Sequence, residues 1–134
     1  NGEAGLAALL RTVDIAVCLI PVTHETRGLL NHQRLRLMRE GAQIINFARA
    51  PIIETDALMA ALDDGHIAHA VLDVFDQEPL PPSSPLWTHP RVSVLPHISG
   101  PTNQETAAII VANNIRHYRN TGEMPEGIDM QRGY

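Results

Sequence analysis

The sequence contains no lysine, and all ten of its basic residues are arginine. Such a chain cannot form a lysine Schiff base, use lysine as a general base or build a phosphate loop that depends on lysine. Fifteen acidic residues outnumber the basic ones and give a formal net charge of −5. No basic excess is available for nucleic-acid phosphates or an anionic membrane surface, so we expect neither partner.

Cysteine and long hydrophobic runs are also scarce. The single cysteine, Cys18, cannot form an internal disulfide, which is typical of a reducing compartment such as the cytoplasm. No apolar run approaches the ~20 residues of a membrane-spanning helix, and no signal peptide is recognisable. Because the first residue is asparagine and not methionine, we expect an upstream segment outside these 134 residues.

Two binding motifs are missing as well. His66 and His69 are three residues apart, but they span a junction between a loop and a strand, so we predict no metal site. The nine glycines include no Gly-x-Gly-x-x-Gly arrangement, which is the phosphate-binding turn that opens a dinucleotide-binding domain.

What the sequence does contain is an alternation of two kinds of segment. Short continuously apolar runs indicate strands of a parallel sheet that is covered on both faces. Apolar residues at helical spacing, such as Leu35 with Met38, indicate helices between them. This alternation predicts an α/β architecture. The predicted strands are residues 14–20, 43–48, 69–75 and 92–95, and the helices surround residues 6–10, 35–38, 58–62 and 109–118.

Local signals mark the ends of these elements. Asn31 is a predicted N-cap, residues 102–105 (TNQE) form a predicted capping box, and Gly65 is a predicted helix stop. Residues 76–90 contain five prolines and are predicted to be an ordered irregular connection. Four strands without the glycine-rich turn predict the C-terminal half of a Rossmann-type doubly wound sheet, with one edge exposed.

Arg49, Glu78 and His97 each come shortly after one of the last three predicted strands. Singly, they have ordinary interpretations as a surface arginine, a loop-ordering glutamate and a loop histidine. Ligands of open α/β sheets bind beyond the carboxyl ends of the strands, so we expect all three at one crevice. A guanidinium can hold a carboxylate, an imidazole can transfer a proton, and a neighbouring carboxylate can orient that imidazole. This set fits the reduction of a 2-keto acid by hydride from a cofactor.

Four segments carry a resemblance to a known family. Residues 46–50 (NFARA), 72–81 (LDVFDQEPLP), 84–87 (SPLW) and 95–100 (LPHISG) resemble the D-isomer-specific 2-hydroxyacid dehydrogenases, in order and with family spacing. The tail 128–134 resembles the glyoxylate/hydroxypyruvate reductase branch, so we expect Tyr134 to be the true C-terminus. One departure is Ala50, where the family usually has glycine; alanine does not adopt positive φ cheaply, so we expect a slightly different turn.

The resemblance implies a catalytic set of Arg49, Glu78 and His97. It also implies that Asp73 accepts a hydrogen bond from the nicotinamide carboxamide, and that Trp87 lies near the substrate or a subunit contact. Residues 47–49 would line the nicotinamide ribose. The cofactor contacts that it implies are Pro21, Phe47, Ala48, Arg49, Asp73, His97, Ser99 and Gly100.

The function that the resemblance implies is the NAD(P)H-dependent reduction of glyoxylate, hydroxypyruvate or a close 2-keto acid. NADP(H) is the expected cofactor, with NAD(H) as the alternative, and the full-length protein is expected to be a cytoplasmic homodimer. Residues 1–134 would be the second half of the NAD(P)-binding domain, without the N-terminal part and the substrate-binding domain. We expect this fragment alone to be inactive. A non-enzymatic, cofactor-sensing regulator with the same fold is the alternative function.

Overall fold

The computed structural model describes residues 2–125, 127 and 129. They belong to two units, Asn1–Ser99 and Gly100–Tyr134, and each is described by itself. Except for Asp129, the tail on which we predicted the reductase branch and the C-terminus lies outside the described residues.

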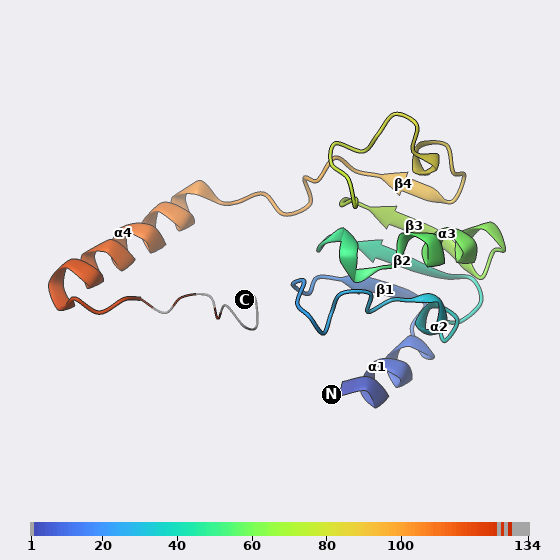
Figure 1. Ribbon diagram of the computed structural model, residues 1–134, viewed down its shortest axis with the longest axis horizontal. Helices are drawn as coiled ribbons and strands as arrows, with labels where there is room; N and C mark the ends of the chain where they lie inside the picture. Colours follow the sequence, from blue (N-terminus) through green and yellow to red (C-terminus); the bar gives the residue numbers. More distant parts are fainter. Residues whose placement is uncertain (1, 126, 128, 130–134) are drawn as a thin grey trace. The chain divides into compact units, whose positions relative to one another are not determined.

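The first unit contains one parallel sheet of four strands (Figure 1). The strands lie side by side in chain order, β1-β2-β3-β4, which confirms the predicted α/β fold. The predictions for the first three strands extend too far at their carboxyl ends, because the strands end at Cys18, Asn46 and Leu72 and the chain continues in loops. The observed bounds are β1 (Ile15–Cys18), β2 (Ala42–Asn46), β3 (Ile67–Leu72) and β4 (Val92–Val94).

All predicted helices are present, although α2 is shorter than its pattern suggests. It is a single turn, so Met38 follows the helix instead of belonging to it. The proline-rich connection, predicted to be irregular throughout, contains a short 3-10 helix at Pro85–Trp87. The helices are α1 (Gly2–Leu10), α2 (His32–Leu35), α3 (Thr55–Asp63) and α4 (Gln104–Thr121), with 3-10 helices η1 (Ala50–Ile52) and η2 (Pro85–Trp87).

Two of the three predicted helix caps are confirmed. The Asn31 side chain accepts a hydrogen bond from the Arg34 N–H at 3.0 Å. Gly65 follows α3 with φ +82°, a conformation that glycine adopts without a steric cost. For α4, the predicted capping residue was wrong by one position: Asn103 and not Thr102 is the N-cap, and its side chain accepts from the Thr106 N–H. No helix among the described residues is long and apolar enough to cross a membrane.

The core of the first unit lies between the sheet and helices α2 and α3. Ile44 of β2 and Ala70 of β3 are fully buried there, together with Leu62 of α3. These apolar contacts pack the sheet against the helices and therefore fix the ends of the strands in space.

The opposite face of the sheet is less covered than predicted. The parallel register places Val17, Ile45 and Val71 in one row, and none of these side chains is buried. Ile15 is 51% exposed and Val17 is 50% exposed. The expectation that both faces are covered is therefore wrong for the described residues of this unit, because its helices pack on one face.

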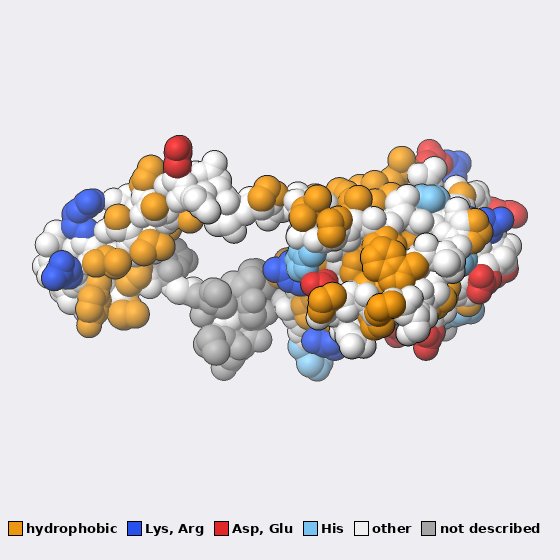
Figure 2. All heavy atoms as spheres, turned by 90° about the horizontal axis from the view of Figure 1, so that it is seen from above, with side chains coloured by type: hydrophobic (Ala, Val, Ile, Leu, Met, Phe, Trp, Pro, Cys, Tyr) orange, Lys and Arg blue, Asp and Glu red, His pale blue; other side chains and the backbone are white. Residues whose placement is uncertain are grey.

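Hydrophobic side chains also gather around the proline-rich connection. Figure 2 looks onto the β4 side of the first unit and shows them in the middle of that face, with charged side chains along its margin. Trp87 of η2 is half-exposed here, and its indole N–H donates to the Pro81 carbonyl at 2.9 Å. The connection is thus ordered by its own hydrogen bonds, as its prolines suggest.

Candidate active site

The parallel strands bring the predicted site residues to one edge of the sheet. The hydrogen-bond ladder continues one residue past the strands: the Asp73 N–H donates to the Asn46 carbonyl and the Leu95 N–H donates to the Leu72 carbonyl. The loops that follow β2, β3 and β4 therefore begin side by side. This is the position at which open α/β sheets bind ligands.

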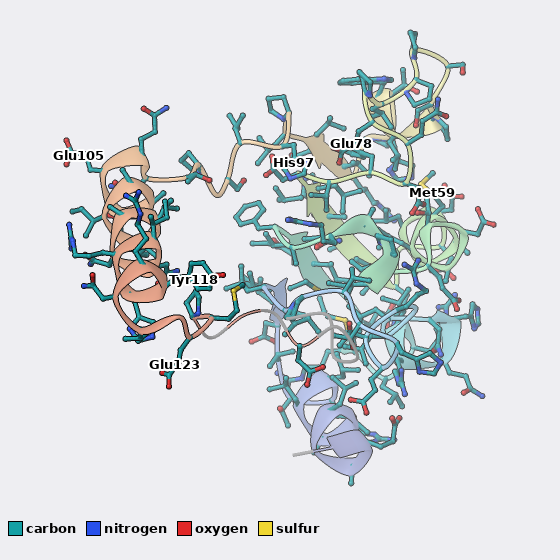
Figure 3. The ribbon with its side chains drawn as sticks, turned by 60° about the vertical axis from the view of Figure 1, so that its left-hand side comes forward. Met59, Glu78, His97, Glu105, Tyr118 and Glu123 are labelled. Carbon is teal, nitrogen blue, oxygen red and sulfur yellow. The ribbon has the colours of Figure 1, made fainter. Side chains whose placement is uncertain are left out.

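Glu78 and His97 form a hydrogen-bonded pair at this edge. The Nδ1 atom of His97 lies 2.8 Å from the Oε2 atom of Glu78. Figure 3 shows the two side chains next to each other, apart from Met59 on α3. Because a carboxylate only accepts hydrogen bonds, Nδ1 carries the hydrogen, and Nε2 is the nitrogen that can exchange a proton with a ligand.

The backbone holds the glutamate of this pair in place. The Phe75 N–H donates to the Oε1 atom of Glu78 at 2.9 Å, so each carboxylate oxygen has its own donor. The hydrogen bond from His97 lowers the pKa of Glu78, with further lowering from the Phe75 N–H and from the nearby Arg49 charge. Glu78 therefore stays ionised beside the imidazole.

Arg49 lies close enough for its charge to act on Glu78, but no ion pair joins these two described residues. Its guanidinium donates to the Ala48 carbonyl at 2.7 Å, and the side chain is exposed. Ala50, the departure from the family pattern, is the first residue of η1 and has no positive φ, so alanine is compatible with this turn.

The turn that presents Arg49 depends on Asn46, a buried residue that the sequence analysis did not single out. Its side chain accepts from the Ala48 N–H at 3.1 Å and donates to the Arg49 carbonyl at 3.0 Å. Asn46 is 2% exposed. The signal that could have found it is an asparagine at the end of a largely apolar strand, where this residue commonly organises a turn.

Asp73 is buried at the same edge, immediately after β3. Its two oxygens accept hydrogen bonds from the N–H groups of Ile98 at 2.9 Å and Ser99 at 2.8 Å. Burial raises the pKa of Asp73, but these hydrogen bonds to the charged form outweigh it and hold the pKa below its ordinary value. Asp73 is thus an ionised anchor for the loop that carries His97.

A cleft of about 490 Å³ opens beside the Glu78–His97 pair. Its walls are otherwise apolar and include Phe75, Leu80 and Trp87. The pair itself is open to solvent, since the side chains of His97 and Glu78 are 46% and 37% exposed.

The remaining predicted cofactor residues lie at or near the same edge. Phe47 and Ala48 form the turn after β2, and Pro21 follows β1, where its carbonyl accepts from the Thr26 hydroxyl at 2.7 Å. Ser99 is bound to Asp73, whereas Gly100 begins the second unit. No group of three or more His, Cys, Asp or Glu side chains among the described residues is arranged to hold a metal ion.

Comparisons with known proteins agree with this geometry. Residues 2–99 match the model of the family described as D-isomer specific 2-hydroxyacid dehydrogenase, NAD binding domain. A D-isomer specific 2-hydroxyacid dehydrogenase from Xanthobacter autotrophicus Py2, solved in complex with NADPH and MES, is 44% identical with a TM-score of 0.92. That match covers 99% of this chain and 55% of the other.

Two further solved structures are similar over nearly the whole chain. A family protein from Klebsiella pneumoniae 342 is 36% identical with a TM-score of 0.88, and the match covers 96% of this chain and 42% of the other. An NADPH-dependent glyoxylate/hydroxypyruvate reductase from Sinorhizobium meliloti, in complex with NADP and sulfate, is 29% identical with a TM-score of 0.90. That match covers 100% of this chain and 44% of the other. The chain therefore spans about half the length of the structures that it matches.

Proposed function

Because this chain belongs to the D-isomer-specific 2-hydroxyacid dehydrogenase family, we propose that the full-length protein is an oxidoreductase that reduces a 2-keto acid to the 2-hydroxy acid. Glyoxylate and hydroxypyruvate are the proposed substrates. The observation that carries the proposal is the 2.8 Å hydrogen bond between His97 and Glu78 at the carboxyl end of the sheet. This pair supplies the proton that the reduction consumes.

In the proposed reaction, the C=O double bond of the keto acid becomes a C–H and an O–H bond. A bound NAD(P)H would provide the hydride for the carbonyl carbon, with NAD(P)⁺ as the oxidised product. The Nε2–H of protonated His97 donates its proton to the carbonyl oxygen, and Glu78 stabilises the imidazolium before the transfer. Atoms and charge balance, since one hydride and one proton are added to the substrate.

Arg49 is the proposed anchor for the carboxylate of the substrate. Its guanidinium is exposed at the edge that holds the pair, and it can bind a carboxylate through two parallel hydrogen bonds. A lysine at this position has a single ammonium in place of the planar fork, so Arg49→Lys should raise the KM for the keto acid by about ten-fold or more.

The described residues suit the nicotinamide end of a dinucleotide. The edge offers the turn at Phe47–Arg49 and the exposed Ser99, but the sequence has no glycine-rich turn for the pyrophosphate. NADP(H) is the proposed cofactor, supported by the NADPH and NADP named for two similar structures, with NAD(H) as the alternative.

The domain assignment is likewise a proposal: residues 1–134 form the second half of the NAD(P)-binding domain of a longer protein. Supporting it, the similar structures are about twice as long as this chain. We propose that the 134-residue chain alone is inactive and binds NADPH only weakly, because pyrophosphate recognition needs a glycine-rich helix N-terminus. Micromolar binding of NADPH to the 134-residue chain, measured by calorimetry, would contradict this assignment.

The decisive experiment is turnover by the full-length protein. NADPH or NADH oxidation is followed at 340 nm with glyoxylate, hydroxypyruvate and pyruvate, and the Arg49→Lys variant is measured beside the wild type. Turnover with a raised KM in the variant supports the proposal. Tight NADPH binding without turnover of any keto acid would instead favour the cofactor-sensing regulator.

For the full-length protein we further propose a cytoplasmic homodimer with small-molecule substrates and with neither nucleic acid nor membrane as a partner. The acidic net charge of −5 supports the last part. Light scattering after size-exclusion chromatography tests the dimer, and a monomeric mass at micromolar concentration would contradict it.

A further inference from the structure

Asp73 is one of two polar or charged side chains buried in the described part of the chain, and it is 1% exposed. No arginine among the described residues forms an ion pair with its carboxylate. Instead, both oxygens are bound to the two consecutive N–H groups that follow His97. A buried carboxylate needs such donors, because burying a charge without partners is very costly.

His97 has an unusual backbone at this point. Its φ of 55° makes it the one non-glycine residue with positive φ among the described residues. This left-handed conformation is unfavourable for a residue with a side chain, and it persists where surrounding contacts fix it. The N–H groups of Ile98 and Ser99, which come directly after this turn, are the contacts that Asp73 fixes.

We propose that Asp73 is a positioning residue for the proton donor of the reaction. By binding the backbone after His97 it holds the left-handed turn, and that turn directs Nδ1 of the imidazole to Glu78 and leaves Nε2 for the substrate. The inference rests on the proposed function, to which it adds a residue that acts through His97.

The same short segment positions both members of the pair. Asp73 binds the loop of His97, and two residues later the Phe75 N–H binds the Glu78 carboxylate at 2.9 Å. The segment that follows β3 thus holds both His97 and Glu78 in position. A shift of this segment would move both groups away from the substrate, and small misplacements of catalytic groups cost large factors in rate.

The role requires a carboxylate at position 73. Asparagine has one acceptor oxygen and one NH₂ group, so in Asp73→Asn one of the two N–H groups would face another donor. The left-handed turn would lose one of its two anchors while the side-chain volume stays nearly the same. Asp76→Asn is the matched control, because Asp76 lies on the same connection and accepts from the Thr55 hydroxyl at 2.5 Å.

The kinetic test compares these two variants in the full-length protein at saturating NADPH. We expect Asp73→Asn to lower kcat by about 100-fold with a small change in the Kd of NADPH, and Asp76→Asn to leave kcat unchanged. If Asp73 instead only accepts a hydrogen bond from the nicotinamide carboxamide, the Kd of NADPH rises and kcat recovers at saturation. That result would overturn the proposal.

A spectroscopic test does not depend on turnover. In the wild type, ¹⁵N chemical shifts of the neutral imidazole of His97 should report the Nδ1–H tautomer, and in Asp73→Asn they should report a mixture. If Asp73→Asn does not fold, amide exchange in the wild type replaces it: the Ile98 and Ser99 amides should exchange slowly, and exchange as fast as in a free loop would overturn the proposal. A wild type without turnover but with the expected tautomer change would defeat the proposed function and leave the positioning role intact. Full turnover by the wild type, together with an unchanged tautomer in Asp73→Asn, would support the proposed function and overturn the positioning role.

Discussion

The third and first strands belong to one parallel sheet, yet their surroundings differ greatly. β3 pairs with β2 and β4, buries Ala70 and Leu72, and ends directly before Asp73, whose hydrogen bonds order the loop after β4. β1 pairs with β2 alone, and two of its four side chains, Ile15 and Val17, are half-exposed. The positions of His97 and Glu78 are therefore fixed by contacts within this chain, whereas the described residues leave the open face of β1 uncovered.

The largest effect is expected from removing the imidazole of His97, the proposed proton donor at the carboxyl ends of β3 and β4. In the full-length protein, His97→Gln should lower kcat by about 1,000-fold, because glutamine cannot donate a proton to the carbonyl oxygen. The Kd of NADPH, measured by fluorescence titration, should change little. His32→Gln, an exposed position at the start of α2, is the control. Equal losses of turnover and cofactor affinity would contradict the role of His97.

A comparison of two isoleucines, Ile44 of β2 and Ile15 of β1, sharpens the difference between the buried core of the sheet and the exposed side chains of β1. Ile44→Ala should lower the free energy of unfolding by about 2–5 kcal/mol, because it leaves a cavity in the core. Ile15→Ala should cost about 0.5 kcal/mol or less in the 134-residue chain, since the side chain is half-exposed. Urea unfolding measures both variants. If Ile15→Ala lowers the free energy of unfolding several-fold more in the full-length protein, another segment of that protein covers the face of β1 that carries Ile15.

The thiol at the end of β1 provides a third test. Burial raises the pKa of Cys18 from 9.0 to about 11. At pH 8 the thiolate fraction should therefore be about 100-fold lower than that of an ordinary cysteine, because each pKa unit changes it ten-fold. Alkylation by iodoacetamide, followed by mass spectrometry, should be slower by at least this factor than in the urea-unfolded chain. Equal rates would mean that β1 opens at its carboxyl end.

The smallest expected effect is a dependence of the free energy of unfolding on pH. The pKa values of Asp73 and Glu78 are both lowered in the folded chain. Their stabilising contribution is therefore present above the unfolded pKa values of about 4, and it is lost as the pH falls through the lower, folded values. Urea unfolding between pH 7 and pH 3 should show less loss of stability on acidification for Asp73→Asn than for the wild type. Identical slopes would contradict the assignment of Asp73 as an ionised anchor.

Much of the fold could be predicted because its signals are local. Apolar runs located the strands, and Asn31 and Gly65 marked helix ends through side-chain and backbone preferences that do not depend on distant residues. An exposed edge of the sheet was predicted, but the uncovered face at Ile15 and Val17 was not, because an apolar run has the same sequence whether or not anything covers it. Met38 shows the same limit for helices: its spacing from Leu35 is helical, but the chain turns away after one turn of helix.

The main residues of the site could be predicted from the sequence, but the residues that hold them in position could not. Arg49, Glu78 and His97 were found because each follows a strand, and parallel strands bring such positions together. Their catalytic roles stay predictions. Asn46 was missed although its hydrogen bonds are local, to the backbone two and three residues further on. Asp73 was assigned to the cofactor, because its hydrogen bonds to a backbone 25 and 26 residues away leave no spacing pattern. The positive φ of His97, on which the orientation of the imidazole depends, has no signature in the sequence either.

The position of Trp87 has a practical consequence. It is the single tryptophan of this chain, its indole is half-exposed, and it lines the same cleft as Glu78 and His97. Indole emission responds to nearby charge and to the polarity of its surroundings, so this chain carries its own optical reporter within the cleft. In any longer protein whose other tryptophans are replaced, the intensity and wavelength of that emission would follow occupancy of the cleft without an added label.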